Sequence, residues 1–161
     1  MSNSLLVIIM GSKADALHGE KIKDAAQQLG LEVALRIGSA HKTPAHVLHI
    51  LTEYESDPRP KVYITVAGRS NALSGFVDGA VITPVIACPP HSEVFSGADI
   101  YSSLRMPSGI APAVVLEPAN AALLAAKILG LADPAVRERV LIFQKLQAKK
   151  VMNDDAVQQS T

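Results

Sequence analysis

A histidine and a lysine stand side by side at His41 and Lys42, within the stretch SAHKTP at residues 39–44. Histidine ordinarily exchanges a proton near neutral pH, which suits a general acid or base, and a lysine ammonium is a point charge that suits a phosphate. Ser39 adds a hydroxyl group, and Pro44 fits the first position of a helix. The stretch is therefore typical of a site for proton transfer beside a bound anion, although glycine, serine and proline also gather at such turns for geometric reasons alone.

Two further stretches also place glycine and polar residues after an apolar run. Residues 11–15 read GSKAD, and residues 68–71 read GRSN. The helix expected after Ser12 offers free N–H groups to a phosphate. Asp15 is placed either to favour that helix dipole or to accept hydrogen bonds from ligand hydroxyls such as those of ribose. Neither a P-loop nor a dinucleotide-binding glycine pattern is present, so a mononucleotide is the better expectation.

The remaining histidines are weaker candidates. His46 and His49 lie three residues apart on an expected helix, but no cysteine or carboxylate stands at ligand spacing, so a metal site is not predicted. His18 is expected on a helix surface. His91 follows two prolines at a strand end, where it either lines the same cleft or belongs to the loop alone.

Cys88 has no basic partner nearby in the sequence, so we expect a small buried side chain rather than a nucleophile. Arg69 and Arg105 are expected to be ion-pair or loop-clamping residues.

The elements that position these residues alternate along the chain between strands and helices. Apolar runs predict strands at residues 5–10, 31–37, 61–67, 84–88 and 113–116. Helical spacing predicts helices at about 13–29, 44–54, 71–79, 98–104, 118–130 and 133–152, with a frayed polar tail at 153–161. This alternation predicts a three-layer α/β/α domain with a parallel sheet, in which the polar loops share one edge.

The composition agrees with one such domain over residues 1–161, with a core at about 5–131. Hydrophobic residues make up 48% and aromatic residues 4%, as expected for helices packed on a parallel sheet. Fifteen basic and 15 acidic residues cancel, and no basic stripe predicts nucleic-acid binding. The single cysteine favours a reducing cytoplasm, and the apolar run at 5–10 is too short for a signal peptide or a membrane span.

The chain resembles the aminoimidazole ribonucleotide (AIR) carboxylases of purine biosynthesis. The resemblance covers about residues 5–131 and rests on the ordered motifs MGSKAD (10–15), SAHKTP (39–44), AGRSN (67–71), CPP (88–90) and SSLRMPSG (102–109). It implies a flavodoxin-like, doubly wound sheet that works without biotin, ATP or a metal. It also implies a homo-oligomer, a tetramer or octamer, with active sites near the subunit contacts.

The resemblance implies a lyase-type reaction, in which CO2 carboxylates AIR at C4 to give 4-carboxy-AIR (CAIR). His41 matches the general acid and base of the family. Asn71 is added to the substrate-binding residues because of its place in the loop. The positions that match substrate-binding residues are Ser12, Asp15, Ser39, Lys42, Gly68 and Ser70.

A second class within the family is a mutase that moves a carboxylate from the exocyclic nitrogen of N5-carboxy-AIR (N5-CAIR) to the ring carbon. Mutases typically have His-Arg where this chain has His41 and Lys42, and a glycine-rich third loop with a further histidine where it has Ser70 and Asn71. We therefore expect a direct carboxylase, with the N5-CAIR mutase as the alternative. A receiver domain would need an acidic cluster after the first strand, and a flavin carrier fits poorly because tryptophan is absent.

The last expected helix carries more apolar residues than one narrow stripe can hide. Such a surplus usually marks a partner surface, so we expect this helix to extend to a neighbouring subunit. The alternative is a helix that sits in a groove of its own subunit. The apolar residues are Val136, Val140, Leu141, Ile142, Phe143 and Leu146.

Overall fold

The computed structural model describes residues 4–159. Five strands form one sheet in the order β2-β1-β3-β4-β5, and every neighbouring pair is parallel. This order is the flavodoxin-like one, which confirms the predicted doubly wound sheet. The strands are β1 (Leu5–Met10), β2 (Glu32–Ile37), β3 (Lys61–Val66), β4 (Val85–Ala87) and β5 (Ala113–Val114).

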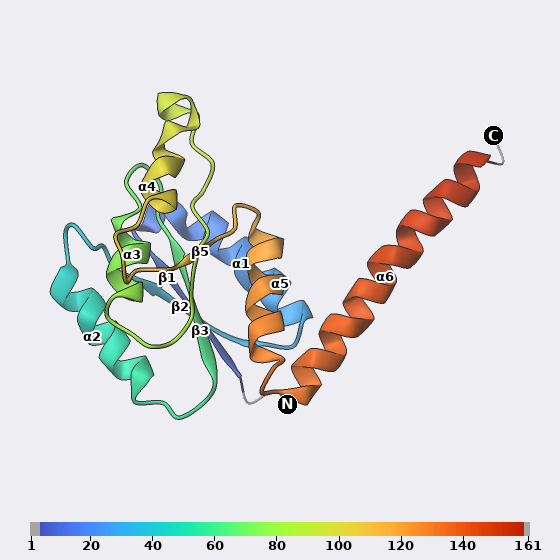
Figure 1. Cartoon of the computed structure of the whole chain (residues 1–161), viewed down its shortest axis with the longest axis horizontal. Coiled ribbons are helices and arrows are strands. Elements are labelled where there is room, and N and C mark those ends of the chain that lie inside the picture. The colour runs from blue at the N-terminus through green and yellow to red at the C-terminus, as the bar shows by residue number, and fades with distance from the viewer. Residues whose placement is uncertain (1–3, 160–161) are drawn as a thin grey trace.

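Helices cover both faces of this sheet. Figure 1 shows α2 and α3 on one face and α1 and α5 on the other, which confirms the three-layer arrangement. The helical elements are η1 (Lys13–Asp15), α1 (Ala16–Gln28), α2 (Pro44–Glu55), α3 (Ala72–Asp78), η2 (Val94–Ile100), α4 (Tyr101–Leu104), α5 (Pro118–Leu129) and α6 (Pro134–Gln159).

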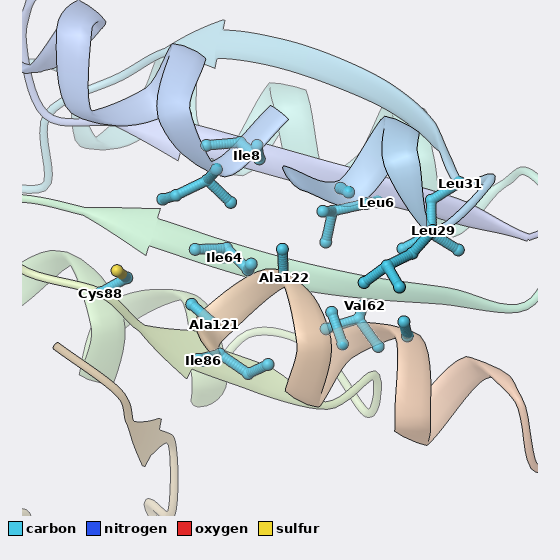
Figure 2. Packing of buried hydrophobic residues seen from close by; sticks show 14 of the residues in the cluster. Leu6, Ile8, Leu29, Leu31, Val62, Ile64, Ile86, Cys88, Ala121 and Ala122 are labelled. Carbon is cyan, nitrogen blue, oxygen red and sulfur yellow. The ribbon is translucent and has the colours of Figure 1, made fainter. Parts of the chain in front are cut away.

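The central strands are buried on both faces because helices cover each of them. Along β1, Leu6 and Ile8 belong to the cluster under α1 and α5, whereas Val7 and Ile9 belong to the cluster under α2 and α3. Figure 2 shows the first cluster, with Ala121 and Ala122 of α5 packed against the strands. Small alanine side chains allow this helix to approach the sheet closely, which accounts for its alanine-rich sequence.

The strand ends that carry the polar loops are aligned by hydrogen bonds that extend the ladders past each strand. Gly11 N–H donates to Val66 O at 2.8 Å, and Gly38 N–H donates to Met10 O at 2.8 Å. β2 and β3 lie on opposite sides of β1, so the sheet is extended in opposite directions from β1 and the loops at the strand ends separate there. Ligands in this class of fold bind at such a switch point.

Helix α6 begins as predicted but ends later. Asp133 Oδ1 accepts hydrogen bonds from the N–H groups of Ala135 at 3.0 Å and Val136 at 3.3 Å, which caps the helix. The expected end near residue 152 and the frayed tail are wrong, because the helix continues to Gln159. No glycine or proline follows Pro134 to stop it. Residues 1–3 and 160–161, included in the expected domain and tail, lie outside the described residues.

The excursion between β4 and β5 also differs from expectation. Its helical part begins at Val94 rather than near residue 98, and it is a 3-10 helix up to Ile100. Ser96 and Gly97 have φ values of 52° and 76°, a left-handed conformation that a continuous α-helix cannot accommodate. Within residues 4–159, no helix has both the length and the apolar character needed to cross a membrane.

Candidate active site

A cavity of about 520 Å³ opens where the loops after β1, β2 and β3 meet. It brings together seven of the eight residues that the sequence predicted for the site, from stretches far apart along the chain. These are Ser12, Asp15, Ser39, His41, Lys42, Gly68 and Ser70. Ala14, Ala40, Arg69, Leu73, Pro90 and Ser92 also line it.

The first loop turns tightly into α1 through η1. The Asp15 carboxylate accepts hydrogen bonds through Oδ2 from Ser12 N–H at 2.9 Å and from the Ser12 hydroxyl at 3.0 Å. Ser12 and Asp15 are therefore held as a pair at the cavity wall. A Cβ atom on Gly11 would lie 3.3 Å from Ala67 Cβ, so a glycine at this position lets the first and third loops pack together.

The second loop presents His41 and Lys42 to solvent on a turn that its own hydroxyls stabilise. Ser39 Oγ accepts from Lys42 N–H at 3.2 Å, and Thr43 Oγ1 accepts from Ser39 N–H at 3.0 Å. Both His41 and Lys42 are exposed. Their backbone is therefore held in place while their side chains stay free to meet a ligand. A Cβ on Gly38 would lie 2.9 Å from Val47 Cγ2, so this position requires glycine for α2 to pack.

The third loop passes through a conformation that is unusual for its sequence. Arg69 has φ of 63°, in the left-handed region, and its N–H donates to Asp99 Oδ2 at 3.2 Å. The turn places Gly68 and Ser70 on the cavity wall. Arg69, expected to be a structural residue, lines the cavity as well. The sequence did contain a signal that Arg69 could line the site, because it is a positively charged residue that directly follows a glycine at a strand end.

Asn71, the eighth predicted residue, does not line this cavity. Its side chain is 1% exposed and caps α3, with Oδ1 accepting from Ser74 N–H at 3.3 Å and Nδ2 donating to Ser103 Oγ at 2.9 Å. Both ends of the amide are therefore engaged by the protein. The structure places Asn71 beneath the loop and beside a smaller cavity that adjoins the first, and its contact with substrate stays a prediction.

A smaller cavity of about 190 Å³ adjoins the first and shares Ala67, Gly68, Arg69, Pro90 and Ser92 with it. His91 lines this smaller cavity and not the larger one, which answers the open question about its place. Pro90 and Ser92 were not expected at the site. Because they lie on an irregular excursion, neither strand nor helix periodicity pointed to them.

His18 differs from its expected place on the surface, since it is partly buried and its Nε2 lies 3.4 Å from the Sγ of Cys88. This contact joins the first turn of α1 to the residue that follows β4. Cys88 is fully buried, as expected. Burial, followed by the charge of Glu117, raises the pKa of the thiol to about 12, so the thiol is protonated at neutral pH.

His46 and His49 are both exposed on α2. Across the described part of the chain, no group of three or more His, Cys, Asp or Glu side chains is arranged to hold a metal ion.

The sequence and fold resemble those of known proteins. A model of the family described as AIR carboxylase matches residues 5–150. The chain is 59% identical over 152 residues to a Treponema denticola protein named phosphoribosylaminoimidazole carboxylase, over 94% of this chain and 96% of that one. It is 54% identical over 149 residues to an Archaeoglobus fulgidus protein of the same name, over 92% of this chain and 82% of that one. The crystal structure of Treponema denticola PurE superposes with a TM-score of 0.93 at 58% identity, covering 95% of this chain and 97% of that chain.

Proposed function

Because the chain belongs to the AIR carboxylase family, we propose that it carboxylates AIR directly with CO2 at C4, giving CAIR. The observation that carries this proposal is the single cavity in which His41 meets Ser12, Asp15 and Lys42. One proton-transfer group and a set of anion and hydroxyl ligands are what this reaction needs. The names of the Treponema denticola and Archaeoglobus fulgidus relatives support a carboxylation of AIR.

In this proposal the substrate phosphate binds between a positively charged side chain and the start of the first helical turn. Lys42 supplies a mobile cation, and the Ser12 hydroxyl lies at the start of the first helical turn. Asp15 accepts hydrogen bonds from the ribose hydroxyls. Its Oδ2 already accepts from Ser12, so the ribose contact and the Ser12 contact share one carboxylate. Ser39, Gly68 and Ser70 then surround the ring and the carboxyl group.

His41 has the central chemical role. The electron-rich C4 of the aminoimidazole attacks CO2 and forms the new carbon–carbon bond. The adduct carries both a hydrogen and a carboxylate on a tetrahedral C4, and His41 removes that proton so that the ring regains its aromaticity. In the reverse direction His41 protonates C4 before CO2 leaves. The exposed imidazole exchanges the proton with solvent between turnovers.

Two residues favour CO2 over N5-CAIR as the source of the carboxylate. Lys42 provides a point charge in place of the planar fork of an arginine, so the phosphate is held less rigidly. Ser70 lines the cavity with a hydroxyl in a loop where the mutases typically carry glycines and a histidine. A direct carboxylase must admit CO2 from solution, whereas a mutase must retain it within the site.

The test is product formation from AIR and bicarbonate, without ATP, set against product formation from N5-CAIR. Saturable, bicarbonate-dependent carboxylation with little turnover of N5-CAIR is the expected result. Efficient turnover of N5-CAIR, with only slow carboxylation at high bicarbonate, would instead assign the chain to the mutase class.

We also propose that the protein is a homo-oligomer, a tetramer or octamer, in which α6 packs on a neighbouring subunit. The helix leaves the body of the domain beyond its first turns (Figure 1) and exposes a row of apolar side chains. Light scattering should give a particle several times the 17.0 kDa of one chain, and Leu146→Glu should reduce its size. A parent particle of one chain mass at micromolar concentration would refute the proposal. The exposed apolar residues of α6 are Leu141, Ile142, Leu146, Val151, Met152 and Val157.

A further inference from the structure

Three hydrogen bonds fasten the third loop (residues 68–71) to the segment at residues 99–103. Arg69 N–H donates to Asp99 Oδ2 at 3.2 Å, and Asn71 N–H donates to Ser102 Oγ at 2.9 Å. The Asn71 side chain donates through Nδ2 to Ser103 Oγ at 2.9 Å. All three donors belong to the loop and all three acceptors to the segment. The excursion between β4 and β5 therefore holds one wall of the candidate active site.

The loop needs such support because its own sequence does not favour its shape. Arg69 lies at φ of 63°, in the left-handed region that non-glycine residues rarely adopt. Backbone of this kind persists only where surrounding contacts fix it. Gly68 and Ser70, on either side of Arg69, are the residues that line the cavity with His41.

Ser102 and Ser103 each accept a hydrogen bond from Asn71, which belongs to the third loop. The Ser102 hydroxyl donates to Asp99 O at 2.7 Å, which turns its lone pairs toward Asn71 N–H. Ser103 is 2% exposed and Asn71 is 1% exposed, so water does not compete for the bond between their side chains. A hydrogen bond in such surroundings is costly to lose, because its partner is left unpaired.

We infer that Ser102 and Ser103 are positioning residues, which act through Asn71 to hold Gly68 and Ser70 at the active site. The inference rests on the proposed function for what Gly68 and Ser70 bind. Neither serine lines the larger cavity, although both line the smaller cavity that adjoins it. Their loss should loosen the loop and weaken the binding of AIR. Because a displacement of about 1 Å at a site can cost as much as about 100-fold in rate, we expect kcat/KM to fall by at least about tenfold.

The experiment compares Ser102→Ala and Ser103→Ala with the parent in two measurements. The first is steady-state carboxylation of AIR with bicarbonate, separated into kcat and KM. The second is amide hydrogen exchange at residues 69–71 in the free protein. We expect KM for AIR to rise about tenfold and these amides to exchange faster. A variant that merely leaves part of the protein unfolded lowers apparent kcat without changing KM, so the rise in KM identifies positioning.

Two further variants serve as controls. Ser102→Thr keeps the hydroxyl and should restore both readouts toward the parent. Ser56→Ala removes an exposed hydroxyl that donates to Glu53 O at 2.7 Å at the far end of α2, and it should change neither readout. If Ser103→Ala does not fold, Ser102→Ala at its partly exposed position still decides the question.

The two readouts separate this inference from the proposed function. Unchanged exchange at residues 69–71 overturns the inference, whatever the activity. Faster exchange with KM within threefold of the parent overturns it as well, because the loop would then move without consequence for binding. A parent protein that does not carboxylate AIR overturns the proposed function instead, and KM is then measured with N5-CAIR while exchange is interpreted as before.

Discussion

The imidazole of His18 lies against the thiol of Cys88, with Nε2 3.4 Å from Sγ. The contact joins α1 to the end of β4, next to the strand ends that form the candidate active site. Sγ also lies 3.7 Å from the carbonyl oxygen of Leu116, to which it donates. Burial and the charge of Lys21 lower the pKa of His18, against smaller opposing effects of the Cys88 contact, Asp15 and Glu117. His18 therefore packs as a neutral group.

This contact predicts that the protein loses stability as the pH falls. The folded pKa of His18 lies below its ordinary value of 6.5, so near and below that pH the unfolded chain binds more protons than the folded one. The free energy of unfolding should therefore decrease as the pH is lowered through about 6.5. His18→Gln should show a smaller decrease between about pH 7.5 and about pH 5.5 in urea melts. His49→Gln, on the exposed side of α2, is the control; equal slopes for all three proteins would contradict the prediction.

Cys88 should be almost inert in the native protein. The thiol is fully buried and its pKa is raised to about 12, so little thiolate is available to attack. A disulfide reagent such as dithionitrobenzoate should react with it slowly in buffer and rapidly in denaturant. The chain has one cysteine, so the absorbance change reports this residue alone. Rapid labelling of the folded enzyme would show that the strand end is accessible.

Thr65→Val should stabilise the protein. The Thr65 hydroxyl is fully buried on β3 and has no hydrogen-bond partner among residues 4–159. An unpaired buried polar group costs about 1–3 kcal/mol, and valine has nearly the same shape and favours strands. We expect the free energy of unfolding to rise by about 1 kcal/mol in denaturant melts. Thr83→Val is the matched control, because the Thr83 hydroxyl donates to Glu55 at 2.9 Å, and it should not stabilise.

His41→Asn should leave the fold and substrate binding intact while removing turnover. Among residues 4–159, His41 is the only histidine that lines the larger cavity, and general acid–base groups contribute about 10²–10⁴-fold in rate. Steady-state rates in both the carboxylation and decarboxylation directions would measure the loss, with His49→Asn as the control. A His41→Asn rate within threefold of the parent would remove this residue from the mechanism.

Lys42→Ala should weaken phosphate recognition. A charge-assisted hydrogen bond contributes about 1.5–3 kcal/mol, so affinity for AIR should fall by about 10-fold to 150-fold. Affinity for the dephosphorylated nucleoside should change little. Calorimetry with both ligands tests this prediction. The control is Lys61→Ala, because Lys61 lies at the beginning of β3, at the other end of the strand from the cavity. Equal losses for the two ligands would show that Lys42 does not touch the phosphate.

The alternation of strands and helices, and the loops that line the cavity, were predictable from the sequence. The apolar run at residues 5–10 is a local pattern, because a strand buried on both faces of a sheet is apolar along its whole length. The start of α6 is also local, because Asp133 caps the helix by accepting hydrogen bonds from residues two and three positions later. Parallel connectivity then required the ends of β1, β2 and β3 to meet at one edge. This is why seven predicted residues share one cavity.

Only the tertiary structure decided which side chains face the cavity and which support it. Asn71 follows Ser70 directly, yet its amide turns inward to Ser103, 32 residues away, because a buried amide needs both of its ends paired. His18 meets Cys88 across 70 residues, because the packing of α1 on the sheet places the first turn of the helix near the end of β4. Such contacts join residues with no local pattern in common. Periodicity along the chain describes neighbours within a few residues, so it contains no information about these pairs.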